Sequence, residues 1–273
     1  SGCCGRTDII YWRMNKENDV NYFKEIRERL IHIEEKMNAA NLGQESGEES
    51  FHHCRDQWWG GFTYAQHGDD LIILNIFHTL GIREFRYLDI GAHHPYHISN
   101  TALLYEQGHR GINIEANPNL IALFRKYRPE DQNINVGVGM QEGVLPFYMI
   151  DDFSGRNTFS REAAEAFVRE YPEFSITQIQ QIPVVTLHDI VERYCGHVFP
   201  EFLSIDVEGL DYDILQSIDM ENKPKIIDVE VEFAGGDNSR SIVALLREKG
   251  YFPYFRAGSN LIFVEHAWRD ALL

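Results

Sequence analysis

Acidic side chains stand at the ends of several short apolar segments of this chain. Asp89 lies in the segment 86–90, Glu115 ends the segment 111–115, and Asp206 follows the segment 202–205. Glu230 ends a fourth segment, 226–230. Carboxylates of this kind can accept hydrogen bonds from hydroxyl groups, take up a proton or bind a hard cation. The spacing therefore predicts an acidic site for a ligand that carries hydroxyl groups, a positive charge or both.

The first of these segments leads into a glycine turn. Residues 86–90 read as a strand, Gly91 allows a sharp turn, and a helix begins near residues 99–101. A strand, turn and helix in this order place a binding crevice at the carboxyl end of a parallel strand. The dinucleotide fingerprint G-x-G-x-x-G is absent, because His93 and Tyr96 occupy its second and third glycine positions. NAD is therefore disfavoured, whereas a nucleoside without a pyrophosphate, such as S-adenosylmethionine, fits the pattern.

Glu115 follows the first strand by about twenty-five residues, close to the spacing of an acidic residue that binds ribose hydroxyls. The alternative is an ordinary glutamate at a strand end. If Asp89, Glu115, Asp206 and Glu230 share one sheet edge, their charges repel each other. Ribose hydroxyls, a sulfonium cation, a metal ion or a bound proton would offset that repulsion.

Methyl transfer to a hydroxyl group needs a group that removes the hydroxyl proton. The candidates are His93, His94, Asp206 and Glu208, because imidazoles and carboxylates are the usual proton acceptors. A divalent ion on Asp206 and Glu230 would serve the same end by acidifying the hydroxyl. Oxygen ligands favour magnesium or calcium over zinc for such an ion.

Alternating strands and helices surround these residues. A mixed sheet with helices on both faces is expected, closed by a hairpin formed from residues 251–256 and 260–265. The longest insertion, residues 151–180, is expected to contact the substrate. The other expected strands are 134–138, 144–150 and 181–185, and the expected helices are 71–80, 118–127, 161–170, 187–194 and 240–249.

Residues 1–50 form a separate region in this interpretation: a polar tail, an amphipathic helix and an acidic linker. Its apolar residues recur at intervals of three and four, as in two heptads: Phe23, Ile26, Leu30, Ile33 and Met37. The stripe either packs on its own domain or joins copies of the chain into a homo-oligomer. Residues 51–273 form the catalytic domain.

Composition limits the classes of function. The 273 residues carry a formal net charge of −17, which disfavours a nucleic-acid partner and leaves a neutral sugar or small polar acceptor as the easier substrate. No apolar run reaches the roughly 20 residues of a membrane span, and no secretory leader is evident. The cysteines lack C-x-x-C spacing, so we expect free thiols and a cytoplasmic setting.

Taken together, the motifs resemble those of the FkbM-type methyltransferases. The resemblance covers about residues 64–232 and depends on the order and spacing of several segments. These are residues 64–70 (YAQHGDD), 88–95 (LDIGAHHP), 99–101 (SNT), 111–118 (GINIEANP), 157–159 (NTF) and 204–209 (SIDVEG).

The resemblance implies a class I, Rossmann-like fold with a doubly wound, mostly parallel seven-stranded sheet and a C-terminal antiparallel hairpin. It implies S-adenosylmethionine as methyl donor and O-methylation of a hydroxyl in a sugar, polysaccharide or glycoconjugate. Asp206, with Glu208 and His94, would form the reaction centre. The residues expected to hold the cofactor are Gln66, Asp89, Gly91, Ala92, Asn100, Glu115 and Ala116.

Other functions remain open at this point. The acceptor could instead be a lipid, another natural product or an amine. The chain could also be a non-catalytic module of the same fold that assembles partners through its N-terminal helix. Cofactor binding separates the enzyme from a module that has lost its site.

Overall fold

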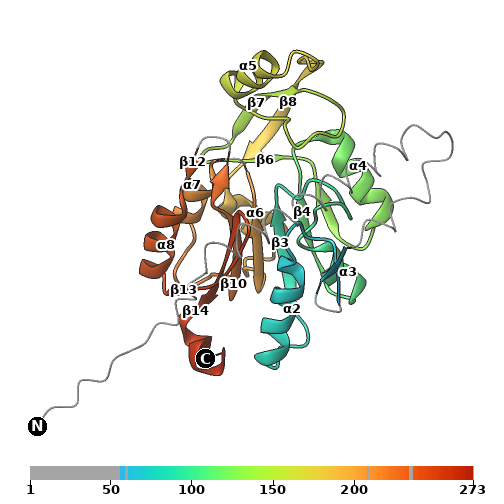
Figure 1. Ribbon diagram of the computed structural model, residues 1–273. Helices are drawn as coiled ribbons and strands as arrows, with labels where there is room; N and C mark the ends of the chain where they lie inside the picture. Colours follow the sequence, from blue (N-terminus) through green and yellow to red (C-terminus); the bar gives the residue numbers. More distant parts are fainter. Residues whose placement is uncertain (1–55, 59–60, 208, 234–235, 273) are drawn as a thin grey trace, which may run out of the picture. The chain divides into compact units, whose positions relative to one another are not determined.

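The computed structural model describes residues 56–58, 61–207, 209–233 and 236–272 (Figure 1). The predicted amphipathic helix, its linker and the boundary near residue 50 lie outside the described residues. So does Glu208, one of the predicted catalytic residues.

A seven-stranded sheet forms the framework, in the order β13-β14-β10-β9-β3-β4-β5. The five strands from β10 to β5 are parallel, whereas β14 is antiparallel to both β10 and β13. The predicted class I sheet with its C-terminal hairpin is confirmed. The strands are β3 (Arg86–Ile90), β4 (Arg110–Ile114), β5 (Gln132–Ile134), β9 (Phe202–Ile205), β10 (Ile226–Glu230), β13 (Tyr251–Ala257) and β14 (Asn260–Glu265).

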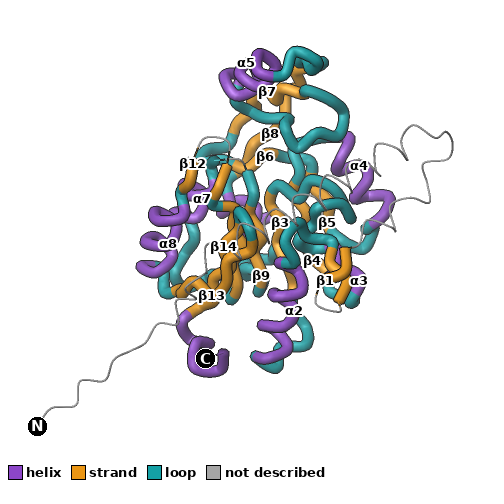
Figure 2. The backbone as a smooth tube through the Cα atoms, viewed as in Figure 1, coloured by secondary structure: helices purple, strands orange, loops and turns teal. Residues whose placement is uncertain are grey.

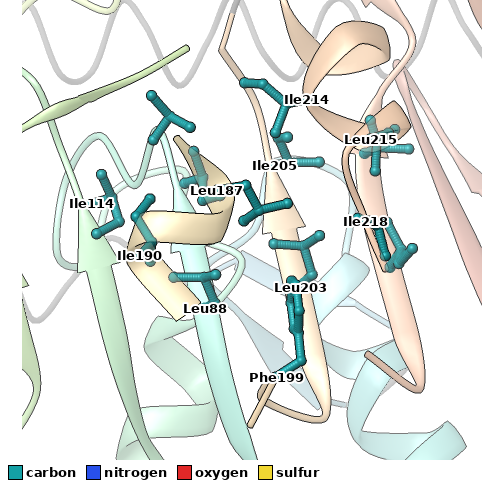
Figure 3. Packing of buried hydrophobic residues seen from close by; sticks show 14 of the residues in the cluster. Leu88, Ile114, Leu187, Ile190, Phe199, Leu203, Ile205, Ile214, Leu215 and Ile218 are labelled. Atoms are coloured by element: carbon teal, nitrogen blue, oxygen red, sulfur yellow. The ribbon is translucent and has the colours of Figure 1, made fainter. Parts of the chain in front are cut away.

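One face of this sheet is apolar along its length. Leu88, Leu203 and Ile205 belong to a buried cluster with residues of α6 (Leu187–Tyr194), α7 (Asp211–Gln216) and α8 (Ser239–Glu248). Figure 3 shows α6 lying over the strands, with Leu187 and Ile190 directed at the sheet. Burial of each aliphatic side chain of this kind contributes roughly 1.5–3 kcal/mol. The cluster therefore fixes the strands that carry the site.

The opposite face changes character along the strands. Near the strand starts, Tyr87, Phe202 and Ile226 pack with residues of α2 (Asp69–Thr79) and α3 (Ala102–Glu106). Two residues further along the same strands stand Asp89, Ser204 and Asp228, all buried. This face is therefore apolar at one end and polar at the end where the strands terminate.

The helix starts follow local sequence signals. Thr186 and Asp189 form a reciprocal capping box at α6. Asn117 caps α4 (Pro118–Tyr127) by accepting the Asn119 N–H, and Pro118 occupies the first helical position. These caps explain why the expected ranges 118–127 and 187–194 match the observed helices.

The strands on either side of the insertion differ from the prediction. The expected strand 134–138 is two strands: β5 stays in the main sheet, whereas β6 (Gly137–Val138) joins β7 (Gly143–Met149) and β8 (Gln178–Val185) in a three-stranded sheet of order β6-β8-β7. Gly137 allows this departure, because a Cβ atom there would meet the Phe159 ring at 2.5 Å. The insertion also contains α5 (Arg161–Glu170), which lies with β7 and β8 at one end of the described domain (Figures 1 and 2).

Short elements complete the described chain. They are the hairpins β1 (Asp56–Trp58) with β2 (Gly61–Thr63) and β11 (Glu232–Phe233) with β12 (Gly236–Asp237), then η2 (His266–Trp268) and α9 (Arg269–Leu272). Among the described residues, no helix combines the length and apolar character that crossing a membrane requires.

Candidate active site

Two rows of residues cross the sheet where β4, β3, β9 and β10 end. Strand register aligns Asn113, Asp89, Ser204 and Asp228 in an inner row. Two positions further along the same strands come Glu115, Gly91, Asp206 and Glu230, which form an outer row. The four predicted carboxylates therefore do gather at one edge, with Asp89 in the inner row and the other three in the outer row.

Gly91 brings the chain across this edge at close range. Its φ of 77° lies in the left-handed region, and its N–H donates to the Ile114 carbonyl at 3.0 Å. A Cβ atom at this position would stand 1.8 Å from the carbonyl oxygen of Asp206. The turn after β3 thus requires glycine for its conformation and for its contact with the turn after β9.

Glu115 is held by backbone donors. Its Oε2 accepts the His93 N–H at 2.9 Å, and its Oε1 accepts the Asn117 N–H at 2.7 Å. Burial raises the pKa of the Glu115 carboxyl to about 7, and the charges of Asp89 and Asp206 add to the shift while the two N–H donors offset part of it. A carboxylate oxygen can accept more than one hydrogen bond, so both oxygens keep capacity for ligand hydroxyl groups.

Asp89 belongs to a buried network that the sequence analysis did not find. Its Oδ2 accepts the Thr101 hydroxyl at 2.6 Å. The Arg128 guanidinium, fully buried, donates to Thr101 at 3.1 Å and forms an ion pair with Asp131 at 2.9 Å. Burial raises the pKa of Asp89, and Thr101 and Arg128 offset part of that shift. Asp89 is therefore a buried residue that helps to position the end of β3, and it does not lie on the exposed surface of the site.

Arg128 connects this network across the sheet. It also donates to the Tyr87 hydroxyl at 2.8 Å and to the Asn113 amide oxygen at 3.1 Å. Removal of one partner from such a buried ion pair is strongly destabilising. The spacing of Arg128 and Asp131 at i and i+3 was the available sequence signal, but it does not reveal burial.

A buried acidic pair, Asp69 and Asp228, lies on the same face. Asp69 begins α2 and Asp228 stands in the inner row, and both are buried. Within the described residues, no hydrogen bond of standard geometry reaches the carboxyl oxygens of either residue. Burial raises the pKa of Asp69 to about 7 and that of Asp228 well above its ordinary value, with the charge of Asp69 adding to the shift at Asp228 and the Asn260 side chain offsetting part of both. The pair therefore binds a proton more tightly than exposed carboxyl groups do.

His93 and His94 have different surroundings. His93 adopts a positive φ of 54°, and burial lowers its pKa to about 4. Burial lowers the pKa of His94 to about 3, and its Nδ1 accepts the N–H groups of Tyr96 at 3.1 Å and His97 at 2.9 Å. Both imidazoles are neutral at pH 7, and the bonding of His94 favours a role in shaping the loop over a role as proton acceptor.

The remaining predicted cofactor residues surround the same edge in different ways. Asn100 donates to the Ser204 hydroxyl at 3.3 Å, and Gln66 is exposed. Ala92 is buried against α4, and the Ala116 carbonyl accepts the Asn135 amide at 2.8 Å. The Ser99 N–H donates to the Tyr64 carbonyl at 3.0 Å, which ties the segment containing Gln66 to the start of α3.

The magnesium expectation finds no support in this geometry. Asp206 is exposed at the end of β9 and Glu230 is half-buried at the end of β10. Across the described ranges, no three histidine, cysteine or acidic side chains are grouped as a metal site requires. Two carboxylates alone provide fewer ligands than magnesium ordinarily takes from protein and substrate together.

Comparison with known proteins identifies a family. The family described as methyltransferase FkbM domain matches residues 89–253, more than half of the chain. The match begins at Asp89 and includes Glu115, Asp206 and Glu230. No curated protein sequence matches the chain significantly.

Solved structures show weak similarity. A TehB-like SAM-dependent methyltransferase from Corynebacterium glutamicum is 12% identical, with 92% of this chain and 100% of that chain covered and a TM-score of 0.39. A 1,6-didemethyltoxoflavin-N1-methyltransferase from Burkholderia thailandensis, solved with 1,6-didemethyltoxoflavin and S-adenosylhomocysteine, is 14% identical, with 73% and 77% covered and a TM-score of 0.36. A precorrin-6y C5,15-methyltransferase from Geobacter metallireducens is 12% identical, with 71% and 86% covered and a TM-score of 0.34.

Proposed function

This chain belongs to the methyltransferase FkbM domain family and is an S-adenosylmethionine-dependent methyltransferase, and we propose that it methylates a hydroxyl group of a sugar or glycan. The observation that carries the proposal is the outer row Glu115, Gly91 and Asp206. At three adjacent strand ends, Glu115 supplies a buried carboxyl that can accept hydrogen bonds from hydroxyl groups, Gly91 supplies a backbone turn without a side chain, and Asp206 supplies an exposed carboxylate.

The residues of this edge fit the proposed donor. Glu115 is oriented by the His93 and Asn117 N–H groups, and its remaining acceptor capacity suits the two vicinal hydroxyls of a ribose. Gly91 allows a ligand to approach the backbone closely. The clustered carboxylates suit the positive charge of a sulfonium. When bound, S-adenosylmethionine supplies an electrophilic methyl group.

The chain's own residues contribute position and proton transfer. Asp206 projects from the end of β9, next to the Gly91 turn, where its carboxylate can accept the proton of the acceptor hydroxyl or orient that hydroxyl. His93 is neutral at pH 7 and is the second candidate for proton acceptor. His94 maintains the loop that follows β3, because its Nδ1 accepts two backbone N–H groups of that loop.

Charge limits the acceptor class. The net charge of −17 disfavours a phosphate-rich acceptor and leaves a neutral polyhydroxylated one as the easier substrate. A saccharide in a polysaccharide or glycoconjugate satisfies that condition. A lipid, another natural product or an amine are the alternative acceptors, and a non-catalytic module is the alternative from another class.

Two further features belong to this proposal. Cys195 is a buried free thiol, and the absence of C-x-x-C spacing in the sequence supports a cytoplasmic setting. The heptad-like stripe from Phe23 to Met37 supports a homo-oligomer.

Calorimetry tests the donor. Titration with S-adenosylmethionine, S-adenosylhomocysteine and NAD should show heat of binding for the two sulfur nucleosides and none for NAD. No heat with either nucleoside at about 1 mM would overturn the donor assignment and leave the non-catalytic module as the better reading.

Mass spectrometry tests the acceptor. Glycans from cells that contain the protein should carry methyl groups that are missing from cells without it and from cells with Asp206→Asn. Unchanged glycans together with a methylated lipid, natural product or amine would replace the saccharide with that acceptor.

A further inference from the structure

Two separate paths of contact lead from Glu115 to one loop of the insertion. Glu115 Oε1 accepts the Asn117 N–H, and the Asn117 side chain donates to the Asp152 carbonyl at 2.9 Å. Glu115 Oε2 accepts the His93 N–H, and the His93 ring lies 3.8 Å from the position of a Cβ atom on Gly155. Both paths end in residues 151–157, which connect β7 to the start of α5.

The loop keeps its shape through its own hydrogen bonds. The Asn157 amide oxygen accepts the Ile150 N–H at 2.7 Å, and the Asn157 amide nitrogen donates to the Asp151 carbonyl at 2.9 Å. The Phe153 N–H donates to the Asp151 carboxylate at 2.8 Å. The conformation of the loop is therefore fixed by hydrogen bonds within it.

Two asparagines at the start of α4 place this loop beside Glu115. Asn117 is buried, with its amide oxygen capping α4 and its amide nitrogen bound to Asp152. Asn119 donates to the same Asp152 carbonyl at 3.3 Å. The side chains of Asn117 and Asn119 thus donate to one backbone oxygen, and both residues follow closely in sequence on Glu115, the carboxylate proposed to hold the ribose.

Stability of the insertion does not explain these contacts. Phe147, Met149 and Ile182 are buried in a cluster of their own, joined by Ala116 and Phe159, and this cluster holds β7 and β8 in place. The asparagine contacts lie close to this cluster, where Asp152 follows β7, but they join polar atoms and add nothing to its apolar packing.

We propose that residues 151–157 form a wall of the nucleoside site, that a ribose bound at Glu115 holds this wall in place, and that Asn117 and Asn119 are its positioning residues. This inference rests on the proposed donor and adds a role for the insertion. A ribose hydroxyl bound to Glu115 restricts the motion of the carboxylate. Because the carboxylate accepts the N–H groups of Asn117 and His93, this also restricts the two places where those residues approach the loop. Donor binding then orders the segment that carries exposed Phe153, so donor binding precedes acceptor binding.

Hydrogen exchange with S-adenosylhomocysteine as the probe tests the inference. In the full chain, the probe should slow amide exchange in residues 151–157. Asn119→Ala should reduce this protection and raise the dissociation rate of the probe about fivefold, the ratio that corresponds to about 1 kcal/mol for one hydrogen bond. Asn119→Asp, which replaces the donor with a carboxylate facing the Asp152 carbonyl, should have a larger effect in the same direction.

Gln181→Ala is the matched control, because Gln181 is exposed on β8, immediately after the insertion. It should change neither protection nor dissociation, and all three variants should keep the unfolding temperature of the free protein. Bound probe without protection of 151–157, or Asn119 variants that match the control, would overturn the inference and leave the donor assignment intact. Absence of probe binding to the unaltered chain would overturn both.

Discussion

A Cβ atom on Gly91 would stand 1.8 Å from the carbonyl oxygen of Asp206, so the backbones of the turns after β3 and β9 lie in close contact. The Asp206 N–H also donates to the Ile90 carbonyl at 3.0 Å. These contacts join the strand that begins the crevice to the strand that delivers the proposed proton acceptor. The two turns therefore form one unit at the point where strand order reverses.

Gly91→Ala should destabilise the fold and weaken donor binding. A non-glycine residue at a strained positive φ costs roughly 1–3 kcal/mol, and the clash with Asp206 adds to that cost. Gly81→Ala provides the control, because Gly81 has a φ of 70° but no atom within 4 Å of its Cβ position. Thermal unfolding should show the larger loss for Gly91→Ala; equal losses would mean that the Asp206 contact relaxes freely.

Sequence patterns predicted the framework and part of the site for a physical reason. The short apolar runs in β3, β9 and β10 indicate buried strands, so the strand ends with Asp89, Glu115, Asp206 and Glu230 could be aligned without coordinates. The prediction of one strand at 134–138 was wrong because extended character does not reveal a pairing partner. Gly137 pairs in another sheet, where the Phe159 ring packs against it.

The buried pairs were not predicted, for a related reason. Packing of α2, α3 and the strands is what brings Arg128 close to Asp89, with Thr101 between them, and what brings Asp228 close to Asp69. Asp228 did carry a signal, since it interrupts the apolar strand β10. The N–H groups on Glu115 and those on His94 depend on a loop conformation with His93 at positive φ, which residue types alone do not specify.

Glu115→Gln should weaken binding of S-adenosylhomocysteine. The substitution keeps the size and one acceptor oxygen but removes the charge, and hydrogen bonds to charged groups are worth about 1.5–3 kcal/mol. The expected loss is roughly 10- to 150-fold in Kd by calorimetry. Exposed Glu130 on the loop before β5 offers the control Glu130→Gln, which should bind as the unaltered chain does. Unchanged affinity in a folded Glu115→Gln protein would return Glu115 to the ordinary strand-end role.

The contribution of the buried Asp69 and Asp228 carboxyls to the stability of the ligand-free protein should fall as pH rises from about 4 to about 7, whereas His93 and His94, whose pKa values are lowered by burial, should contribute in the opposite direction. Asp69, with a folded-state pKa of about 7, and Asp228, also raised, bind protons more tightly when folded than when unfolded. Their contribution is complete below the unfolded pKa near 4 and is lost as pH rises through the folded values, by up to about 1.4 kcal/mol per pH unit for each group. Urea unfolding at several pH values measures the slope.

Asp228→Asn should shift the slope of stability against pH toward more positive values, because the amide does not titrate and the negative contribution of Asp228 is lost. Glu115 and Asp89 also have raised pKa values, so part of the slope should remain. The exposed Asp270 of α9 supplies the control Asp270→Asn, which should keep the original slope. A slope identical in Asp228→Asn and the control would show that Asp228 is not protonated in the folded protein.

Removal of residues 1–43 should change the assembly state or the solubility of the protein. The stripe Phe23, Ile26, Leu30, Ile33 and Met37 must cover apolar surface somewhere, on its own domain or on another copy. Light scattering of the full and shortened chains measures the mass distribution, and thermal unfolding measures stability. The same mass and the same unfolding temperature in both would make this segment dispensable for assembly and folding.

Asp206→Asn should abolish methyl transfer while preserving the fold and donor binding. The exposed Asp206 carboxylate is not part of the buried core, and its backbone contacts with Ile90 and Gly91 do not involve the side chain. Loss of a positioned proton acceptor lowers turnover by roughly 10²–10⁴-fold. Calorimetry with S-adenosylhomocysteine and thermal unfolding should therefore remain close to the values of the unaltered protein while turnover falls.

A chelator and added magnesium complete this last assay. Full activity of the unaltered protein in chelator, with no gain from magnesium, would fit the absence of a metal cluster among the described side chains and leave Asp206 as base or orienting group. Activity lost in chelator and restored by magnesium would place an ion on Asp206 and Glu230, with the acceptor supplying further oxygen ligands. Full activity of Asp206→Asn would remove the assignment altogether and move the reaction centre to His93, whose neutral imidazole lies between Glu115 and the loop at Gly155.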